Sequence, residues 1–224
     1  MSSSKPPNSR PEGAGVPPAV VSRLSRYLRE LQHLVADGAQ TTSSSQLGVR
    51  LGFTDAQVRK DLAHFGQFGH PGIGYRCDEL IAEIRKILGT DRKWSVALMG
   101  VGNLGRALLG YRGFESQGFK IVAAFDADPG KSGRKIEGID VYGVDQLNEL
   151  VMELGIELGM IAAPAAAAQA AADQLVAAGV RGILNFAPVT LSLPAGLSVV
   201  SVDLARELEQ VTFAVANRLR ADAG

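Results

Sequence analysis

The sequence predicts an α/β protein in which a helical module precedes a parallel sheet wrapped by helices, with one more helix at the end. Apolar stripes at helical spacing run through residues 17–88. From residue 93 onward, short apolar runs alternate with helical stretches, which is typical of a parallel sheet with crossover helices. The formal net charge is zero, but residues 1–89 carry +3 and residues 90–224 carry −3. The two modules are therefore expected to have different partners.

Composition excludes several classes of protein. With 46% hydrophobic and 21% charged residues, the chain can bury a real core. Its one cysteine, Cys77, excludes an internal disulfide framework and a multi-cysteine metal site, and it is typical of a reducing compartment. No secretory signal opens the chain, and the longest uncharged stretch, 182–202, contains prolines and predicts strand, loop and strand. We expect a cytoplasmic protein without a metal or a membrane span.

The first module, residues 17–90, begins with a long helix. Residues 1–16 are polar and rich in Pro and Gly, so they predict a disordered tail. Pro17 and Pro18 then open the helix. Its expected buried stripe consists of Val20, Val21, Leu24, Leu28, Leu31, Leu34 and Val35.

Two short helices and a hairpin complete the module. Ser43–Gln46 and Thr54–Gln57 each fit the capping-box pattern, and Gly52-Phe53 makes the turn between the two helices. The second helix is expected to bury Val58, Leu62 and Phe65. A glycine-rich hairpin follows, then a helix over 77–88 and a boundary at 89–91. This order predicts a winged helix-turn-helix, a DNA-binding arrangement.

Several side chains of this module suit DNA. Gln and Arg can bind adenine or guanine edges, whereas Lys and Ser hydroxyls suit phosphates. The candidate DNA-binding residues are Ser43, Ser44, Ser45, Gln57, Arg59, Lys60 and His64. Alternatives remain open: Gln57 could only close its capping box, Arg59 and Lys60 could form a solvated helix face, and His64 could be a bystander. Three-helix modules also bind proteins.

The second module, residues 91–202, is predicted to be a Rossmann-type domain. Its expected strands are 94–99, 120–125, 158–163 and 182–186, and its expected helices are 104–112, 144–154 and 165–178. The Ala-rich helix 165–178 is expected to pack closely on the sheet. The last segment, 203–224, carries an apolar seam of roughly heptad spacing and predicts a dimerisation helix.

A glycine-rich motif predicts a dinucleotide site. Gly100-Val101-Gly102-Asn103-Leu104-Gly105 follows a predicted strand and opens a predicted helix. Gly100 permits the tight turn, Gly102 lets the pyrophosphate approach the backbone, and Gly105 lets helix and strand pack closely. The N–H groups at the helix N-terminus suit the phosphates.

An acidic residue indicates which dinucleotide binds. Asp126 ends the second predicted strand, 21 residues after Gly105. A carboxylate there accepts from the ribose hydroxyls and repels a 2′-phosphate, which favours NAD over NADP. Lys131, Arg134 and Lys135 lie close enough to leave NADP open.

The second module lacks the groups that hydride transfer needs. Dehydrogenases of this fold usually place a proton donor, often His or Lys, beside the nicotinamide. No histidine follows His70 and no lysine follows Lys135. We therefore expect no catalytic residue and a protein that binds NAD without turning it over. Two alternatives are an NAD-dependent oxidoreductase with an added helical domain and a relative of CoA-binding ligase subunits; the missing histidine argues against both.

Several motifs in one order resemble those of the redox-sensing transcriptional repressor family Rex. They are AQVRKDLAHFGQFGHPGIGY at 56–75, GVGNLGRALLGYRGF at 100–114, FDADPGKSG at 125–133, AAPA at 162–165, GILNFAPV at 182–189 and VDLARELE at 202–209. The resemblance covers nearly the whole chain. It implies a homodimer that binds inverted-repeat operators in double-stranded DNA, senses the NADH/NAD⁺ ratio and is released from DNA by NADH.

The resemblance also implies roles for particular residues. The nicotinamide is expected near Ala163, Pro164, Asn185, Phe186 and Pro188. The C-terminal helix is expected to be exchanged between subunits. A polar network of Arg29, Tyr111 and Asp203 is expected to change with the cofactor state. From the residues alone, Tyr111 would be a helix-end aromatic, Asp203 an N-cap and Arg29 a solvated charge.

Overall fold

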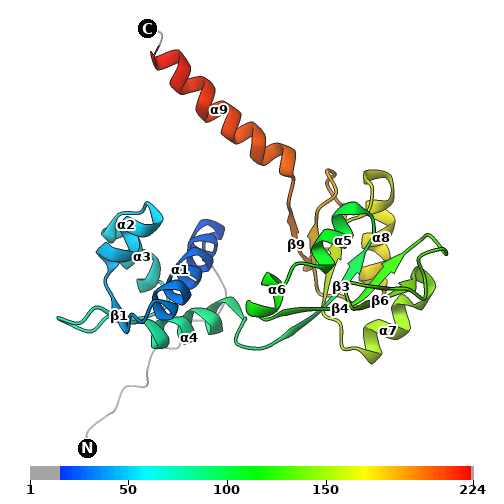
Figure 1. The fold of residues 1–224 in the computed structure, drawn as a ribbon, viewed down its shortest axis with the longest axis horizontal. Helices are drawn as coiled ribbons and strands as arrows, with labels where there is room; N and C mark the ends of the chain where they lie inside the picture. Colours follow the sequence, from blue (N-terminus) through cyan, green and yellow to red (C-terminus); the bar gives the residue numbers. More distant parts are fainter. Residues whose placement is uncertain (1–15, 223–224) are drawn as a thin grey trace, which may run out of the picture. The chain divides into compact units, whose positions relative to one another are not determined.

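The computed structural model describes residues 16–222, so all but the last residue of the predicted disordered tail lies outside the described part. The chain divides into two compact units, Met1–Asp91 and Arg92–Gly224 (Figure 1). Each unit encloses its own apolar core. The two units are described separately below.

From residue 16 onward, the first unit is built from four helices and a short two-stranded sheet. Its elements are α1 (Pro18–Ala36), β1 (Thr41–Thr42), α2 (Ser44–Leu51), α3 (Asp55–Ala63), β2 (Tyr75–Arg76) and α4 (Cys77–Leu88). Strands β1 and β2 pair antiparallel. The predicted hairpin is shorter than expected, since a single bridge joins His70 to Gly74, and β2 pairs instead with β1.

One predicted core stripe needs correction. On α1, Val21 and Val35 are 41% and 44% exposed, although the spacing predicted them to be buried. The fully buried Tyr27 takes part in the core instead and meets Phe53 edge to face. Five of the seven predicted residues are buried, so this helix, which packs on one side, buries a narrower stripe than the spacing predicted. Similarly, Phe65 follows the end of α3 and is only half-buried against the core.

The ends of α2 and α3 differ. Ser43 caps α2 with a complete capping box, since its Oγ accepts from the Gln46 backbone and Gln46 Oε1 accepts from the Ser43 backbone. Thr54 caps α3 with only half of the predicted box, because its Oγ1 accepts from the Gln57 backbone. The Gln57 side chain donates instead to Asp61, 2.7 Å away.

Asp61 is the centre of a buried polar network that joins α3 to α1. Its carboxylate is 1% exposed and accepts from Arg23 Nε and Nη2 at 2.6 and 2.8 Å, and from the Tyr27 hydroxyl at 2.8 Å. With the Gln57 amide, four donors satisfy one buried charge. Burial alone would raise the pKa of Asp61, but these hydrogen bonds outweigh burial and hold the pKa below its ordinary value.

The second unit contains a seven-stranded sheet. Its elements are β3 (Trp94–Met99), α5 (Asn103–Leu109), α6 (Gly113–Ser116), β4 (Phe119–Asp126), β5 (Lys135–Ile136), β6 (Ile139–Gly143), η1 (Val144–Gln146), α7 (Leu147–Glu153), β7 (Leu158–Ile161), α8 (Ala165–Ala177), β8 (Gly182–Asn185), β9 (Ser198–Ser201) and α9 (Leu204–Asp222). The strand order is β5-β6-β4-β3-β7-β8-β9, and all pairs except β5–β6 are parallel. From β6 to β9 this is the strand order of the Rossmann fold.

Two helical layers cover the sheet. Alternate residues of β3 enter different cores: Val96 and Leu98 pack with Leu109 of α5, whereas Ala97 and Met99 pack with α7 and α8. The alanines of α8 pack closely on the sheet as predicted, since Ala168 and Ala172 are fully buried. The β5–β6 hairpin was not predicted. Its turn at Glu137-Gly138 has positive φ at both residues, and its strands are too short to leave a pattern.

Helix α9, which spans 19 residues, buries none of them. Its exposed large apolar side chains are Leu204, Leu208, Val211, Phe213, Val215 and Leu219. Five of these six form the predicted seam, namely Leu204, Leu208, Val211, Val215 and Leu219. Within residues 16–222, no helix is both long enough and apolar enough to span a bilayer.

We predict that Asp61→Asn destabilises the first unit by about 2–4 kcal/mol, because Arg23 then keeps a partly buried charge without its carboxylate. Calorimetry of the full chain measures this. The fluorescence of Trp94, the single tryptophan, identifies the transition of the second unit. Since the folded pKa of Asp61 is lowered, its stabilisation is complete above about pH 4 and is lost as the pH falls through the folded value.

Asp55→Asn is the matched control, because Asp55 lies on the same helix in an exposed pair with Arg59. It should leave the transition of the first unit nearly unchanged. Equal shifts in both variants would contradict the central role of Asp61.

Candidate functional site

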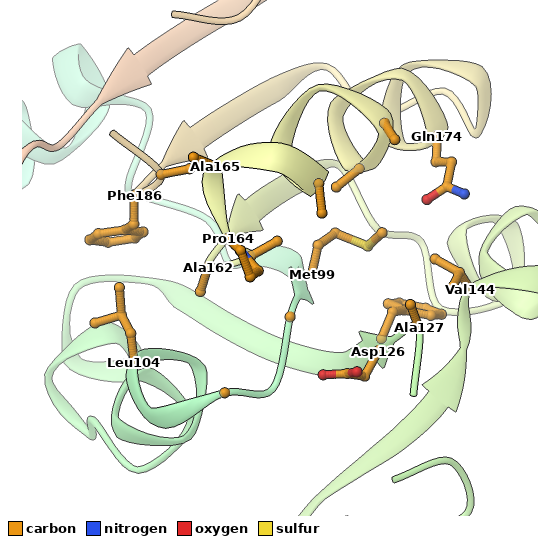
Figure 2. Close-up of a pocket in the computed structure, with 18 of the residues that line it drawn as sticks. Met99, Leu104, Asp126, Ala127, Val144, Ala162, Pro164, Ala165, Gln174 and Phe186 are labelled. Carbon is orange, nitrogen blue, oxygen red and sulfur yellow. The ribbon is translucent and has the colours of Figure 1, made fainter. Parts of the chain in front are cut away.

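A pocket of about 660 Å³ opens at the carboxyl ends of β3, β4, β7 and β8 (Figure 2). Strands β3 and β7 are neighbours there, although the chain leaves them toward opposite sides of the sheet, and ligands of such folds bind at this position. The lining includes the predicted site residues Gly100, Gly102, Asn103, Leu104, Asp126, Ala163, Pro164, Phe186 and Pro188. Thus the structure brings together most of the predicted cofactor site.

The three glycines of the motif occupy different surroundings. Gly100 has φ +94°, and a Cβ there would lie 2.9 Å from the Ala162 and Ala163 backbone. A Cβ on Gly105 would lie 2.0 Å from the carbonyl oxygen of Gly100. At Gly102, by contrast, a Cβ would meet no atom within 4 Å, and this residue lines the pocket. Gly100 and Gly105 are required by the fold, whereas Gly102 leaves space in front of the backbone.

Asp126 connects the loop after β4 to the glycine loop. Its Oδ2 accepts from the Val101 backbone at 2.7 Å and from Lys131 Nζ at 2.9 Å, and its Oδ1 accepts from the Asp128 backbone at 2.9 Å. Burial alone would raise the pKa of Asp126, but these hydrogen bonds outweigh it and hold the pKa below its ordinary value. The carboxylate is therefore ionised at neutral pH and faces the pocket as an acceptor.

The end of the pocket that lies away from Asp126 is apolar. Phe186 and Leu104 lie at this end, whereas Val144 and Gln174 lie at the other (Figure 2). Asn185 is fully buried and does not line the pocket; its amide donates to the carbonyls of Ala187 and Val189 and accepts from the Ala187 backbone. Asn185 thus shapes the loop that presents Phe186 and Pro188.

Some predicted cofactor residues act behind the pocket, and some lining residues were missed. Val101 and Gly105 are buried next to the pocket without lining it. The missed lining residues include Met99, Phe125, Val144, Gln174 and several alanines of α8. Met99 and Phe125 end predicted strands, so their position could have indicated them. Val144 and Gln174 belong to elements distant in sequence and left no signal.

The candidate DNA-binding residues lie on α2 and α3 of the first unit. Arg59 donates to Asp55 at 2.7 Å and to Ser44 Oγ at 3.1 Å, which brings the N-terminal ends of α2 and α3 together. Ser45 and Lys60 are exposed, and Ser43 caps α2. His64 is exposed at the C-terminal end of α3, against the edge of Phe65. Gln57 is half-buried and held by Asp61, so its amide is less available than predicted.

The three predicted switch residues have ordinary local roles in this structure. Tyr111 is 58% exposed and meets Phe114 edge to face. Asp203 caps α9, since its Oδ1 accepts from the backbones of Ala205 and Arg206. Arg29 is exposed on α1. Among the described residues, no hydrogen bond joins Tyr111 to Asp203.

The described part of the chain has neither a cluster of metal-ligating side chains nor an exposed thiol. Over residues 16–222, no three His, Cys, Asp or Glu side chains gather as metal ligands would. Cys77 is fully buried at the start of α4, and burial raises the pKa of its thiol. A buried thiol of raised pKa is a packing residue.

Comparisons with known proteins agree with this division. A family model described as "Putative DNA-binding protein N-terminus" matches residues 15–63, and one described as "CoA binding domain" matches residues 91–189. The redox-sensing transcriptional repressor Rex of Carboxydothermus hydrogenoformans is 50% identical over 202 residues, which are 90% of this chain and 97% of that protein.

Solved structures of RSP, a Rex-family repressor, match over both units. RSP in complex with NAD⁺ and operator DNA has a TM-score of 0.87 at 34% identity, and the match covers 94% of this chain and 97% of RSP. RSP in complex with NADH has a TM-score of 0.83 at 34% identity, with 93% and 99% covered.

We predict that Gly105→Ala destabilises the second unit by about 2–3 kcal/mol, because the new methyl group would collide with the Gly100 carbonyl. Thermal unfolding followed by Trp94 fluorescence measures this. Gly102→Ala is the control and should unfold at the same temperature or slightly above it. It should nevertheless weaken NADH binding, since its methyl group enters the space above the loop. Equal destabilisation by both substitutions would contradict the conclusion that Gly105 is required by packing and Gly102 is not.

Proposed function

The chain belongs to the Rex family of redox-sensing transcriptional repressors, and we propose that it represses transcription according to the NADH/NAD⁺ ratio. In this proposal the first unit binds an inverted-repeat operator in double-stranded DNA. The second unit binds NADH or NAD⁺, and NADH releases the protein from DNA. RSP, 34% identical over nearly the whole chain, is known with both nucleotides and with operator DNA.

The observation that carries the proposal is the pocket beside the glycine loop. The backbone at Gly102 leaves room for a pyrophosphate, and the ionised Asp126 provides acceptors for the adenine ribose. With the ribose at Asp126 and the pyrophosphate over Gly102, an extended dinucleotide directs its nicotinamide toward Phe186 and Pro188. Ala163 and Pro164 lie at the same pocket. These residues remain proposed contacts.

The pocket suits sensing better than catalysis. The ionisable side chains of its described lining are Asp126 and Lys131, which pair with each other at 2.9 Å. Phe186, Pro188 and Leu104 leave the opposite end without a proton donor for hydride transfer. The relatives that match along the whole chain are named as repressors, so the chain is a regulator rather than an enzyme.

The proposed DNA interface uses the exposed side of α2 and α3. Arg59 is more than half exposed and can leave Asp55 for a guanine edge, since an exposed ion pair is weak. Lys60 and the serines Ser43, Ser44 and Ser45 suit phosphates. Gln57 is proposed to orient Asp61 rather than to bind a base. His64 lies at the far end of α3 and is the weakest candidate.

The proposed assembly is a homodimer that uses α9. Six large apolar side chains of this helix are exposed, and a second copy with the same helix would cover them. Two-fold symmetry also matches an inverted-repeat operator. The proposed location is the cytoplasm, where such an operator would be reached. Sedimentation of the chain shortened to residue 202 tests the dimer, because it should yield monomers.

The proposed sign of the switch follows from the charge of the nicotinamide. The oxidised ring carries a positive charge, and desolvating that charge against Phe186 and Pro188 is costly. The neutral reduced ring can enter this apolar end and so stabilise a dimer whose paired α3 helices no longer match the operator. Arg29, Tyr111 and Asp203 are proposed to change partners in this step. Because the coupling is reciprocal, operator DNA must weaken NADH binding by the same factor.

We predict that NADH dissociates an operator complex at fixed salt, whereas NAD⁺ leaves the complex intact and competes with NADH. Fluorescence anisotropy of labelled operator measures both effects. A shift from 99% bound to 99% released requires NADH to favour the free form by roughly 5.5 kcal/mol. The Gly102→Ala variant serves as the control, since it should stay on DNA at the same NADH concentration. A complex that survives saturating NADH would overturn the proposed switch.

We further predict that Arg59→Ala weakens operator binding by about 1–3 kcal/mol and relaxes specificity at one base pair. Lys60→Ala should weaken binding to all DNA and reduce the slope of affinity against salt concentration by about one. Lys86→Ala on α4, which removes an exposed pair with Glu83, is the control and should change neither quantity. Unchanged operator affinity in both α3 variants would refute the assignment.

A further inference from the structure

The carboxylate of Asp126 already has three hydrogen-bond donors from the chain itself. Oδ2 accepts from the Val101 backbone and from Lys131 Nζ, and Oδ1 accepts from the Asp128 backbone. An ionised carboxylate offers about four acceptor positions. About one position therefore remains, and it belongs to Oδ1.

An adenine ribose in the proposed site needs more than this. Its 2′ and 3′ hydroxyl groups can donate two hydrogen bonds, and the proposed function directs both toward Asp126. With one acceptor position left, binding both hydroxyl groups requires one of the three present donors to withdraw.

Two of the three donors are fixed in the backbone. The Val101 N–H follows Gly100, whose backbone packs directly against Ala162. The Asp128 N–H belongs to a turn in which Asp128 Oδ1 accepts from the Gly130 backbone. The third donor, Lys131, is the end of a flexible side chain that is 34% exposed. Lys131 is the donor that can leave at low cost.

We propose that Lys131 is a specificity-determining residue of the adenine-ribose subsite, because it competes with the ribose hydroxyl groups for Asp126 and, once displaced, can pair with a 2′-phosphate. This inference rests on the proposed function, and it adds which residue sets the choice between NAD(H) and NADP(H). Lys131 reduces the preference for the unphosphorylated nucleotide that Asp126 alone would impose.

The surrounding charges support Lys131 over its neighbours. Lys131 lines the pocket, and it is the cation that does so among the described residues. Lys135 pairs with Asp140 at 3.4 Å and lies outside the lining. Without Lys131, the lining would present the Asp126 carboxylate to a 2′-phosphate with no cation to offset it.

The test is Lys131→Met in the full-length protein, which removes the charge and keeps most of the stem. Calorimetric titration would measure Kd for NADH and NADPH, and for ADP-ribose and 2′-phospho-ADP-ribose, which lack the nicotinamide. In both pairs, the ratio of the Kd of the phosphorylated to that of the unphosphorylated ligand should rise about tenfold or more. Lys131→Arg should keep the wild-type ratio, as should the control Lys135→Met.

The outcomes separate this inference from the proposed function. If wild-type protein binds NADH but Lys131→Met leaves the ratio unchanged or lowers it, the specificity role is wrong and the proposed function stands. A loss of affinity by the same factor for both ligands of a pair also leaves the ratio unchanged and counts against the inference. If wild-type protein binds neither NADH nor ADP-ribose, the proposed function fails first and this inference falls with it.

Discussion

The geometry of the second unit depends on the close approach of two loops where β3 and β7 end side by side. A Cβ on Gly100 would lie 2.9 Å from the Ala162 and Ala163 backbone, and Gly105 packs on Gly100 in turn. This contact determines where α5 begins and how near the glycine loop comes to the loop before α8. The pocket is the space that remains in front of these two loops, so its position follows from backbone packing before any polar side chain is considered.

The carboxylate of Asp126 links a third strand, β4, to these two loops. Its hydrogen bond to the Val101 backbone joins the end of β4 to the loop after β3. One group therefore has two roles, since it holds two strand ends together and faces the pocket as an acceptor. Such a carboxylate must remain ionised although it is largely buried, and the donors around it ensure this. Lys131 is part of that compensation, which is why it is also in a position to affect ligand choice.

Sequence patterns predicted the elements whose signals are local. The strand Trp94–Met99, the helix Cys77–Leu88 and the glycine turn lie where periodicity and spacing placed them. The Asp61 network was not predicted, because it joins α1 to α3 across 38 residues and a buried aspartate has no local signature. Of the two hydrogen bonds of the capping box predicted at Gln57, only the one from its backbone N–H to Thr54 forms. The side-chain amide of Gln57 donates to Asp61 instead. In the pocket, Gln174 and Val144 come from different crossovers, and only the fold brings them together.

A sensor must also connect its ligand site to the surface that binds its partners. In this chain, hydrogen bonds connect the loop after β8 to the start of α9. The side chain of Asn185 shapes the loop that carries Phe186 and Pro188, while its backbone carbonyl accepts from the Val202 backbone at 2.8 Å. The next residue, Asp203, caps α9. The apolar end of the pocket is thus one hydrogen bond and one residue away from the helix with unburied apolar side chains. A ligand that moves Phe186 acts close to the base of α9, whereas Asp126 lies farther along the pocket, away from Phe186. With the nicotinamide placed at Phe186 as proposed above, its redox state, rather than occupancy by a dinucleotide alone, acts next to the base of α9.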